Sequence, residues 1–281
     1  MPEIAYVNGS FMPIEEAVVP IEDRGYQFAD GVYEVIATYG GKPYAMEPHL
    51  QRLERSLSEL RIDFDIRTYD LEDIVLEGIG RGGFGETLIY IQITRGVAPR
   101  HHEYGAAKLE PTVVLTIKEL HRPSVDFHQS GVRVITAPDL RWKRCDIKSI
   151  ALLPNILAKQ AAAEAGAYEA LLIDDEGRVI EGSSTSAFCV RDGVVWTAPK
   201  GPHILPSITR GILLEVMRQL AIPLREEFST LEEYINADEV FIAGTSTEAL
   251  PVVQIGENVI GAGRPGPLTR RIRQGFMKTI D

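Results

Sequence analysis

The order of strand-like and helix-like segments constrains this chain most, because the two kinds interleave without a regular strand–helix–strand alternation. Strand patterns are predicted at residues 87–94, 112–118, 132–137, 169–173, 186–190, 194–197 and 239–243. Helical spacing of apolar residues is predicted at 50–60, 71–79, 155–165, 208–220 and 268–278. A doubly wound parallel sheet requires regular alternation of the two. The pattern therefore predicts an α+β fold.

The length of the chain permits two domains. At about 150 residues per domain, 281 residues make one large domain or two modest ones. The stretch 121–131 has few large apolar side chains and contains Pro123, which predicts a linker. We expect a smaller N-terminal α+β domain over residues 1–120 and a larger, β-rich C-terminal domain over residues 132–281.

Charge and composition exclude several kinds of partner. With 29 basic and 40 acidic residues the net charge is −11, which disfavours nucleic acid and anionic membrane surfaces. No apolar run approaches the ~20 residues that span a bilayer, and no leader pattern is visible at the N-terminus. Only Cys145 and Cys189 are present, as expected of reduced thiols in a cytoplasmic protein. The histidines form no ligand cluster, and we expect no metal.

Lys148 has the most unusual setting among the lysines. It lies in the short, mostly apolar stretch CDIKSIALL. Loss of solvation there favours the neutral amine, which is a nucleophile. The same residue could instead extend its amine outward or pair with Asp146.

Two further segments offer ligand contacts. Glu181 begins the run EGSSTS between two strands, which combines a carboxylate with several hydroxyl and backbone donors, although such a run is also common in plain turns. The segment from Pro206 to Arg210 opens a predicted helix. A helix N-terminus binds phosphate readily, although Ser207 is equally an ordinary cap.

A lysine amine, a carboxylate and an anion-binding helix start together match the needs of pyridoxal phosphate. The amine reacts with the cofactor aldehyde, the carboxylate keeps the ring nitrogen protonated, and the phosphate needs an anion site. No one of these elements is specific, but their combination predicts this cofactor.

Six strings, in order, carry a resemblance over essentially the whole chain: EDRGYQFADGVYE (Glu22–Glu34), TRGVAPRHH (Thr94–His102), RWKRCDIKS (Arg141–Ser149), EGSSTSAF (Glu181–Phe188), ILPSITR (Ile204–Arg210) and TSTEALPV (Thr245–Val252). The sequence resembles the D-amino-acid (D-alanine) aminotransferases, which are fold-type IV pyridoxal-phosphate enzymes. The resemblance implies a two-domain fold, transamination and a homodimer.

The resemblance also implies residue roles. Lys148 would be the Schiff-base lysine and proton shuttle, and Glu181 would hold the pyridine nitrogen. The phosphate and ring hydroxyl would be held by Arg52, Ile208, Thr209, Thr245 and Arg141. The substrate pocket and its trap for the α-carboxylate would be formed by Tyr33, Tyr90, Arg100 and His102. One position departs from the family, because Ser186 stands where an Asn is usual, and a hydroxyl offers fewer hydrogen bonds than an amide.

The implied reaction is a ping-pong transamination between a D-amino acid such as D-alanine and a 2-oxo acid such as 2-oxoglutarate. Close alternatives are branched-chain L-amino-acid transamination and (R)-amine transamination, and the string around Arg100 and His102 favours D-amino acids over both. A lyase of the aminodeoxychorismate type would share the fold and the lysine. An acidic α+β binding module remains the alternative if Lys148 is only structural.

Overall fold

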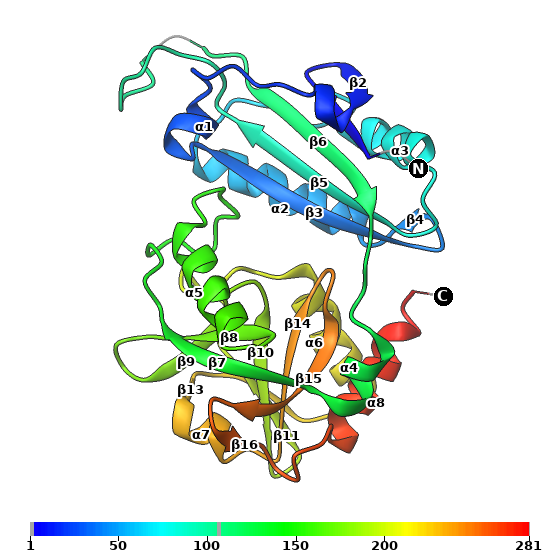
Figure 1. Ribbon diagram of the computed structural model, residues 1–281, viewed down its shortest axis with the longest axis vertical. Coiled ribbons are helices and arrows are strands. Elements are labelled where there is room, and N and C mark those ends of the chain that lie inside the picture. The colour runs from blue at the N-terminus through cyan, green and yellow to red at the C-terminus, as the bar shows by residue number, and fades with distance from the viewer. Residues whose placement is uncertain (1–2, 106–107, 281) are drawn as a thin grey trace. The chain divides into compact units, whose positions relative to one another are not determined.

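The computed structural model describes residues 3–105 and 108–280, and the chain divides into two compact units. The first unit is Met1–His121 together with Ile147–Ala151, and the second unit is Arg122–Asp146 together with Leu152–Asp281. Of the helices in these described ranges, none has both the length and the apolar character needed to cross a lipid bilayer. Each unit contains helices and a sheet (Figure 1), so the α+β prediction is confirmed.

The first unit is built on an antiparallel sheet in the order β2-β1-β6-β5-β3-β4. Its described elements are β1 (Ile4–Val7), β2 (Ser10–Pro13), a short 3-10 helix (Ile14–Glu16), α1 (Arg24–Phe28), β3 (Gly31–Tyr39), β4 (Lys42–Pro43), α2 (Met46–Glu59), α3 (Leu71–Gly82), β5 (Thr87–Thr94) and β6 (Thr112–Glu119). The β1–β2 hairpin turns at Asn8 and Gly9, both with positive φ, as this residue pair favours.

One apolar core joins α2, α3 and the sheet of the first unit. Leu50, Leu53 and Leu57 recur at helical spacing along α2 and are all buried. They share the core with isoleucines of the strands, such as Ile36 and Ile91. This packing fixes which face of α2 points at β3, and therefore which polar residues of α2 can reach that strand.

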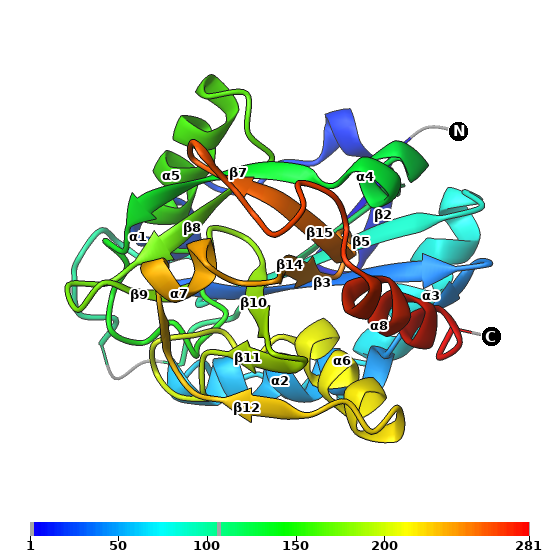
Figure 2. The same cartoon turned by 90° about the horizontal axis from the view of Figure 1, so that it is seen from below.

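The second unit contains a larger mixed sheet, most of whose strands are labelled in Figure 2. Its strand order is β12-β11-β10-β14-β15-β7-β8-β9-β13, with β16 paired to β15. Its described elements are α4 (Val125–Ser130), β7 (Val132–Pro138), α5 (Leu153–Glu164), β8 (Glu169–Ile173), β9 (Arg178–Gly182), β10 (Ser186–Arg191), β11 (Val194–Thr197), α6 (Ile208–Gln219), β12 (Leu224–Glu226), β13 (Ser229–Thr230), α7 (Leu231–Ile235), β14 (Glu239–Gly244), β15 (Glu248–Ile255), β16 (Asn258–Val259) and α8 (Pro267–Met277).

Parallel pairing in this sheet is confined to β7 with β8, β15 with β7, and β11 with β12, within the described residues. Helix α5 connects the parallel pair β7 and β8. The stretch expected to be a linker contains helix α4, which Ser124 caps by accepting a hydrogen bond from Phe127 N.

Candidate active site

Lys148 is placed by a short stretch of chain that lies along β3. Tyr33 N donates to Lys148 O at 3.0 Å, and Ile150 N donates to Gly31 O at 3.1 Å. These bonds, which extend the sheet past the edge of β3, fix the lysine backbone in the first unit. The Lys148 Nζ lies 4.1 Å from the centroid of the Tyr33 ring. The carboxylate of Asp146 is bound by Arg144 instead.

A buried carboxylate occupies the helix-facing side of the same strand. Glu34 has no exposed surface, and Arg52 of α2 binds it with two nearly parallel bonds, Nε–Oε1 at 2.7 Å and Nη2–Oε2 at 2.8 Å. His49, one helical turn before Arg52, reaches Oε2 at 2.7 Å.

The charges of this cluster determine its protonation. Burial raises the pKa of Glu34, but the charge and hydrogen bonds of Arg52 outweigh burial and hold that pKa at about 2, with Lys148 contributing. Burial lowers the pKa of His49, although Glu34 opposes the effect. Glu34 is therefore an anion at neutral pH, and the guanidinium of Arg52 already has a carboxylate partner within the first unit.

Two tyrosines lie on the opposite face of the sheet. Tyr33 and Tyr90 stack with ring centroids 5.5 Å apart, and the Tyr90 hydroxyl donates to Gln92 Oε1 at 2.7 Å. Burial raises the pKa of Tyr90, and the neighbouring Tyr33 adds to the effect. The first unit therefore brings Lys148, Tyr33 and Tyr90 together.

Arg100 and His102 lie in the exposed loop that follows β5 in the first unit. Among the described residues, no hydrogen bond or ring contact joins either side chain to Tyr33 or Tyr90. The geometry thus places these two predicted residues in the same unit as Lys148 without showing a contact with it.

Glu181 lies inside strand β9 of the second unit, not in a turn. It is 6% exposed, it accepts a hydrogen bond from Arg141 Nη1, and its Oε2 accepts only a long bond, 3.4 Å, from Leu205 N among the described residues. Arg141 is held by Asp139 as well, Nη2–Oδ2 2.7 Å. Burial raises the pKa of Glu181, against the opposing charge of Arg141. Two residues predicted to bind the cofactor therefore contact each other.

A second buried carboxylate, Glu169 at the start of β8, organises the turn that follows Glu181. It accepts hydrogen bonds from the hydroxyls of Ser183, Ser184 (2.7 Å) and Thr185 (3.2 Å), and from Ser184 N at 3.3 Å. Glu169 has no exposed surface. The turn is thus fixed from inside the second unit by one buried carboxyl group.

The start of α6 keeps backbone donors available. Ser207 Oγ accepts from Arg210 N at 3.2 Å, but within the described chain the N–H groups of Ile208 and Thr209 have no acceptor. Helix α6 packs against β14, and Thr245 follows directly after that strand. A twelve-residue helix presents its positive end here, as anion binding requires.

Ser186 begins β10, where it is buried and paired with Ala243 of β14. In the described structure its hydroxyl makes no hydrogen bond.

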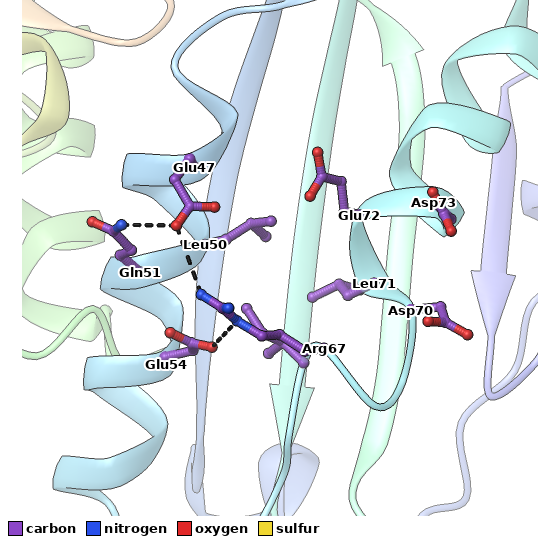
Figure 3. A pocket seen from close by; sticks show the side chains of 10 residues that line it. Glu47, Leu50, Gln51, Glu54, Arg67, Asp70, Leu71, Glu72 and Asp73 are labelled. Carbon is purple, nitrogen blue, oxygen red and sulfur yellow. Dashed lines mark hydrogen bonds and ion pairs between the residues drawn. The ribbon is translucent and has the colours of Figure 1, made fainter.

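A pocket of about 360 Å³ lies elsewhere, between α2 and α3 (Figure 3). Half of its lining residues are acidic, and Arg67 pairs there with Glu47 and Glu54. None of the predicted site residues lines it. Across the described part of the chain, no three His, Cys, Asp or Glu side chains are grouped so that they could hold a metal ion.

The sequence patterns did not predict roles for Glu34, His49 or Glu169. A signal existed for the first two, because Glu34 stands in phase with the apolar residues of its strand and His49 lies three residues before Arg52 on one helix face. Glu169 gave no signal, since a polar residue at the head of an apolar run is common.

The comparisons agree on the family. The Amino-transferase class IV family matches residues 31–255, and the chain belongs to this family. It is 40% identical to the D-alanine aminotransferase of Staphylococcus haemolyticus, covering 98% of this chain and 97% of that protein. It is 42% identical to the D-alanine aminotransferase of Bacillus licheniformis, covering 97% and 95%.

Solved structures agree as well. A branched-chain amino acid aminotransferase of T.th., solved with pyridoxamine 5'-phosphate, matches with a TM-score of 0.90 at 28% identity, covering 100% of this chain and 94% of that one. The branched-chain amino acid aminotransferase of Escherichia coli matches with a TM-score of 0.85 at 25% identity, covering 100% and 95%. The predicted fold-type IV architecture is confirmed.

We predict that Glu34→Gln lowers the free energy of unfolding at neutral pH by about 3–5 kcal/mol, because Arg52 loses its buried counter-charge. The pKa of Glu34 is depressed from 4.5 to about 2. The carboxylate therefore stabilises the fold fully above pH 4.5, and this stabilisation is lost as the pH falls toward 2. The difference between variant and wild type should shrink over that range, as measured by urea unfolding.

Glu54→Gln is the matched control, because Glu54 lies on the same helix in an exposed ion pair worth at most about 1 kcal/mol. If the difference in the free energy of unfolding between Glu34→Gln and wild type stayed constant from neutral pH down to about 3, the low pKa of Glu34 would be contradicted.

Proposed function

We propose that this protein is a pyridoxal-phosphate-dependent D-amino-acid transaminase that transfers the amino group of a D-alanine-like donor to a 2-oxoglutarate-like 2-oxo acid. The observation that carries the proposal is the similarity to D-alanine aminotransferases, at 40–42% identity over nearly the full length of both chains. The donor and acceptor are small amino acids and 2-oxo acids that react in turn.

The residues present fit the cofactor. Glu181 offers a buried carboxylate oxygen that, within the described part of the chain, accepts only one long bond, as required to hold a protonated ring nitrogen. The N–H groups of Ile208 and Thr209, which have no acceptor among the described residues, suit a phosphate dianion. When bound, pyridoxal phosphate supplies an aldehyde that condenses with amines and a ring that accepts electrons.

Individual residues would then hold the cofactor as follows. Lys148 would attach it through Nζ, Glu181 would hold the ring nitrogen, and Arg141 would face the ring hydroxyl. The phosphate would be held by Arg52, Ile208, Thr209 and Thr245. Since Arg52 already binds Glu34 with two donors, Glu34 orients the guanidinium that the phosphate would meet.

Lys148 is the proposed general base. Its Nζ takes the α-proton of the amino acid and later returns a proton, which a flexible four-carbon side chain can do without movement of its backbone. The backbone bonds to β3 keep the root of this side chain fixed. Tyr33, Arg100 and His102 bind the α-carboxylate, and Tyr90 lines the pocket beside Tyr33.

One alternative has a specific observation in its favour. The solved structures with TM-scores of 0.85–0.90 are branched-chain aminotransferases, which makes branched-chain amino acids the second candidate substrates. Their identity of 25–28% is well below that of the D-alanine enzymes. The exposed Arg100–His102 pair also supports a carboxylate trap, which an (R)-amine would not need.

We propose a smaller N-terminal domain and a larger C-terminal domain that supplies most of the cofactor contacts, while Lys148 and Arg52 lie in the first unit. Both cysteines are free thiols, which supports a cytoplasmic location.

A test of the reaction uses the two enantiomers of alanine. Holoenzyme incubated with 2-oxoglutarate and D-alanine should release pyruvate at least tenfold faster than with L-alanine, measured by coupling to lactate dehydrogenase. For the second candidate, branched-chain transamination, the same holoenzyme is incubated with 2-oxoglutarate and L-leucine, and the glutamate formed is measured with both donors. Faster turnover of L-leucine than of D-alanine would replace the proposal by that alternative.

Lys148→Ala should reduce turnover by at least about 10³-fold, because the nucleophile and the proton acceptor are lost together. Lys143→Ala is the matched control, an exposed lysine of the same segment, and should retain wild-type rates. Borohydride reduction and peptide mapping should place the cofactor adduct on Lys148 in the control. An adduct on a different lysine would refute the assignment.

We further propose a homodimer. Three large apolar side chains of α5, Leu153, Ile156 and Leu157, are each 58–66% exposed, an arrangement typical of surfaces covered by a partner. Light scattering after size exclusion should give twice the chain mass of 31.1 kDa, and Ile156→Asp should shift the protein toward monomer. A wild-type protein that is monomeric at micromolar concentration would contradict the proposal.

A further inference from the structure

A short stretch around α1 lies directly against the loop that carries Arg100 and His102 (Figure 1). Arg24 N donates to Gly96 O at 2.9 Å, and Asp23 forms a bridge with Val97. The approach is close enough that a Cβ on Gly25 would meet Thr94 Cγ2 at 2.2 Å. Glycine is therefore required where α1 packs on the end of β5.

The side chain of Arg24 holds the loop by its backbone. It is 3% exposed. Its Nη1 donates to the carbonyl of His101 at 2.7 Å, its Nη2 donates to the carbonyl of His102 at 3.0 Å, and its Nε donates to Asp30 Oδ2 at 2.8 Å. Arg95 binds both oxygens of Asp30, Nε to Oδ2 at 2.8 Å and Nη2 to Oδ1 at 3.0 Å. One planar guanidinium thus fixes two consecutive peptide groups of the loop.

The side chain of Phe28 supports the two functional side chains themselves. The Arg100 guanidinium lies 4.9 Å from the Phe28 ring centroid, and the His102 ring meets Phe28 edge-on at 5.7 Å. The Arg24 guanidinium lies at 4.9 Å from the same ring. Within the described residues Arg100 has no carboxylate partner, so its charge remains for a ligand anion.

We propose that Arg24 and Phe28 are positioning residues that hold Arg100 and His102 in the geometry needed to bind the α-carboxylate of the substrate. The inference rests on the proposed function. A fork-shaped guanidinium binds a carboxylate well only in a narrow range of orientations. The loop between β5 and β6 contains no helix or strand in its described part, so ordering its side chains when a ligand binds costs conformational entropy. Because Arg24 and Phe28 already order the loop, this entropy is lost before substrate binds and does not weaken binding.

The test uses Arg24→Lys, which keeps the charge but loses the fork, and Phe28→Leu, which keeps the apolar volume but loses the ring. Each should raise the KM for D-alanine and the inhibition constant of propionate at least tenfold, while kcat stays within threefold of wild type. Propionate is the probe because it offers a carboxylate and no amine. The visible absorbance of the holoenzyme should not change, because neither residue contacts the cofactor in the proposal.

Controls separate positioning from folding. Phe28→Tyr keeps the ring and should restore wild-type constants. Phe11→Leu is matched, because Phe11 carries a comparable stacked arginine, Arg81 at 4.7 Å, on other elements of the first unit, and it should leave both constants unchanged. Arg100→Ala removes the side chain that binds the carboxylate, so it sets the largest rise expected in the KM for D-alanine and in the inhibition constant of propionate.

Unchanged KM and propionate inhibition in both Arg24→Lys and Phe28→Leu would overturn the inference, as would equal rises in Phe11→Leu. Failure of the proposed function would look different, since wild-type enzyme would then release no pyruvate from D-alanine. A wild type that turns over D-alanine, with both variants unaffected, would reject only the positioning role.

Discussion

The carboxylate of Glu34 has no exposed surface, so the first unit must neutralise it from within. An unpaired anion in such a place costs several kcal/mol, and α2 supplies both Arg52 and His49 to meet it. This pairing locks the rotation of α2 against β3. Because the segment with Lys148 is bonded to the same strand, the lysine, the arginine and the two stacked tyrosines hold fixed positions in one unit.

The second unit solves a similar problem with Glu169. Its carboxylate gathers three hydroxyls and a backbone N–H into one turn. A Cβ on Gly244 would lie 3.6 Å from Ser184 O, so the loop with Thr245 rests on the turn that Glu169 fixes. In both units a buried carboxyl group orders the segment that carries the functional residues.

Local patterns predicted most helices and several strands, because the apolar residues of these elements repeat with the right spacing. Strand β15 was missed, since Pro251 inside it argues against a strand, and β9 was missed because Arg178 and Glu181 leave only two consecutive apolar residues in it. For the candidate site, the resemblance of short motifs predicted a role for each residue separately, but not the contacts between them. The contacts of Glu34 and Glu169 join positions far apart in sequence, and no local pattern encodes them.

Residues 147–151 belong to the first unit, although the chain on either side of them belongs to the second. Neither unit is therefore a continuous stretch of polypeptide. A gene fragment ending near His121 would encode a β3 whose Gly31 and Tyr33 have lost their hydrogen-bonding neighbours, which leaves an edge open to pairing with other chains. Recombination between relatives that exchanges the whole first unit must replace two separate stretches of sequence. A single crossover near residue 121 would take Lys148 from one parent and β3, to which its backbone is bonded, from the other.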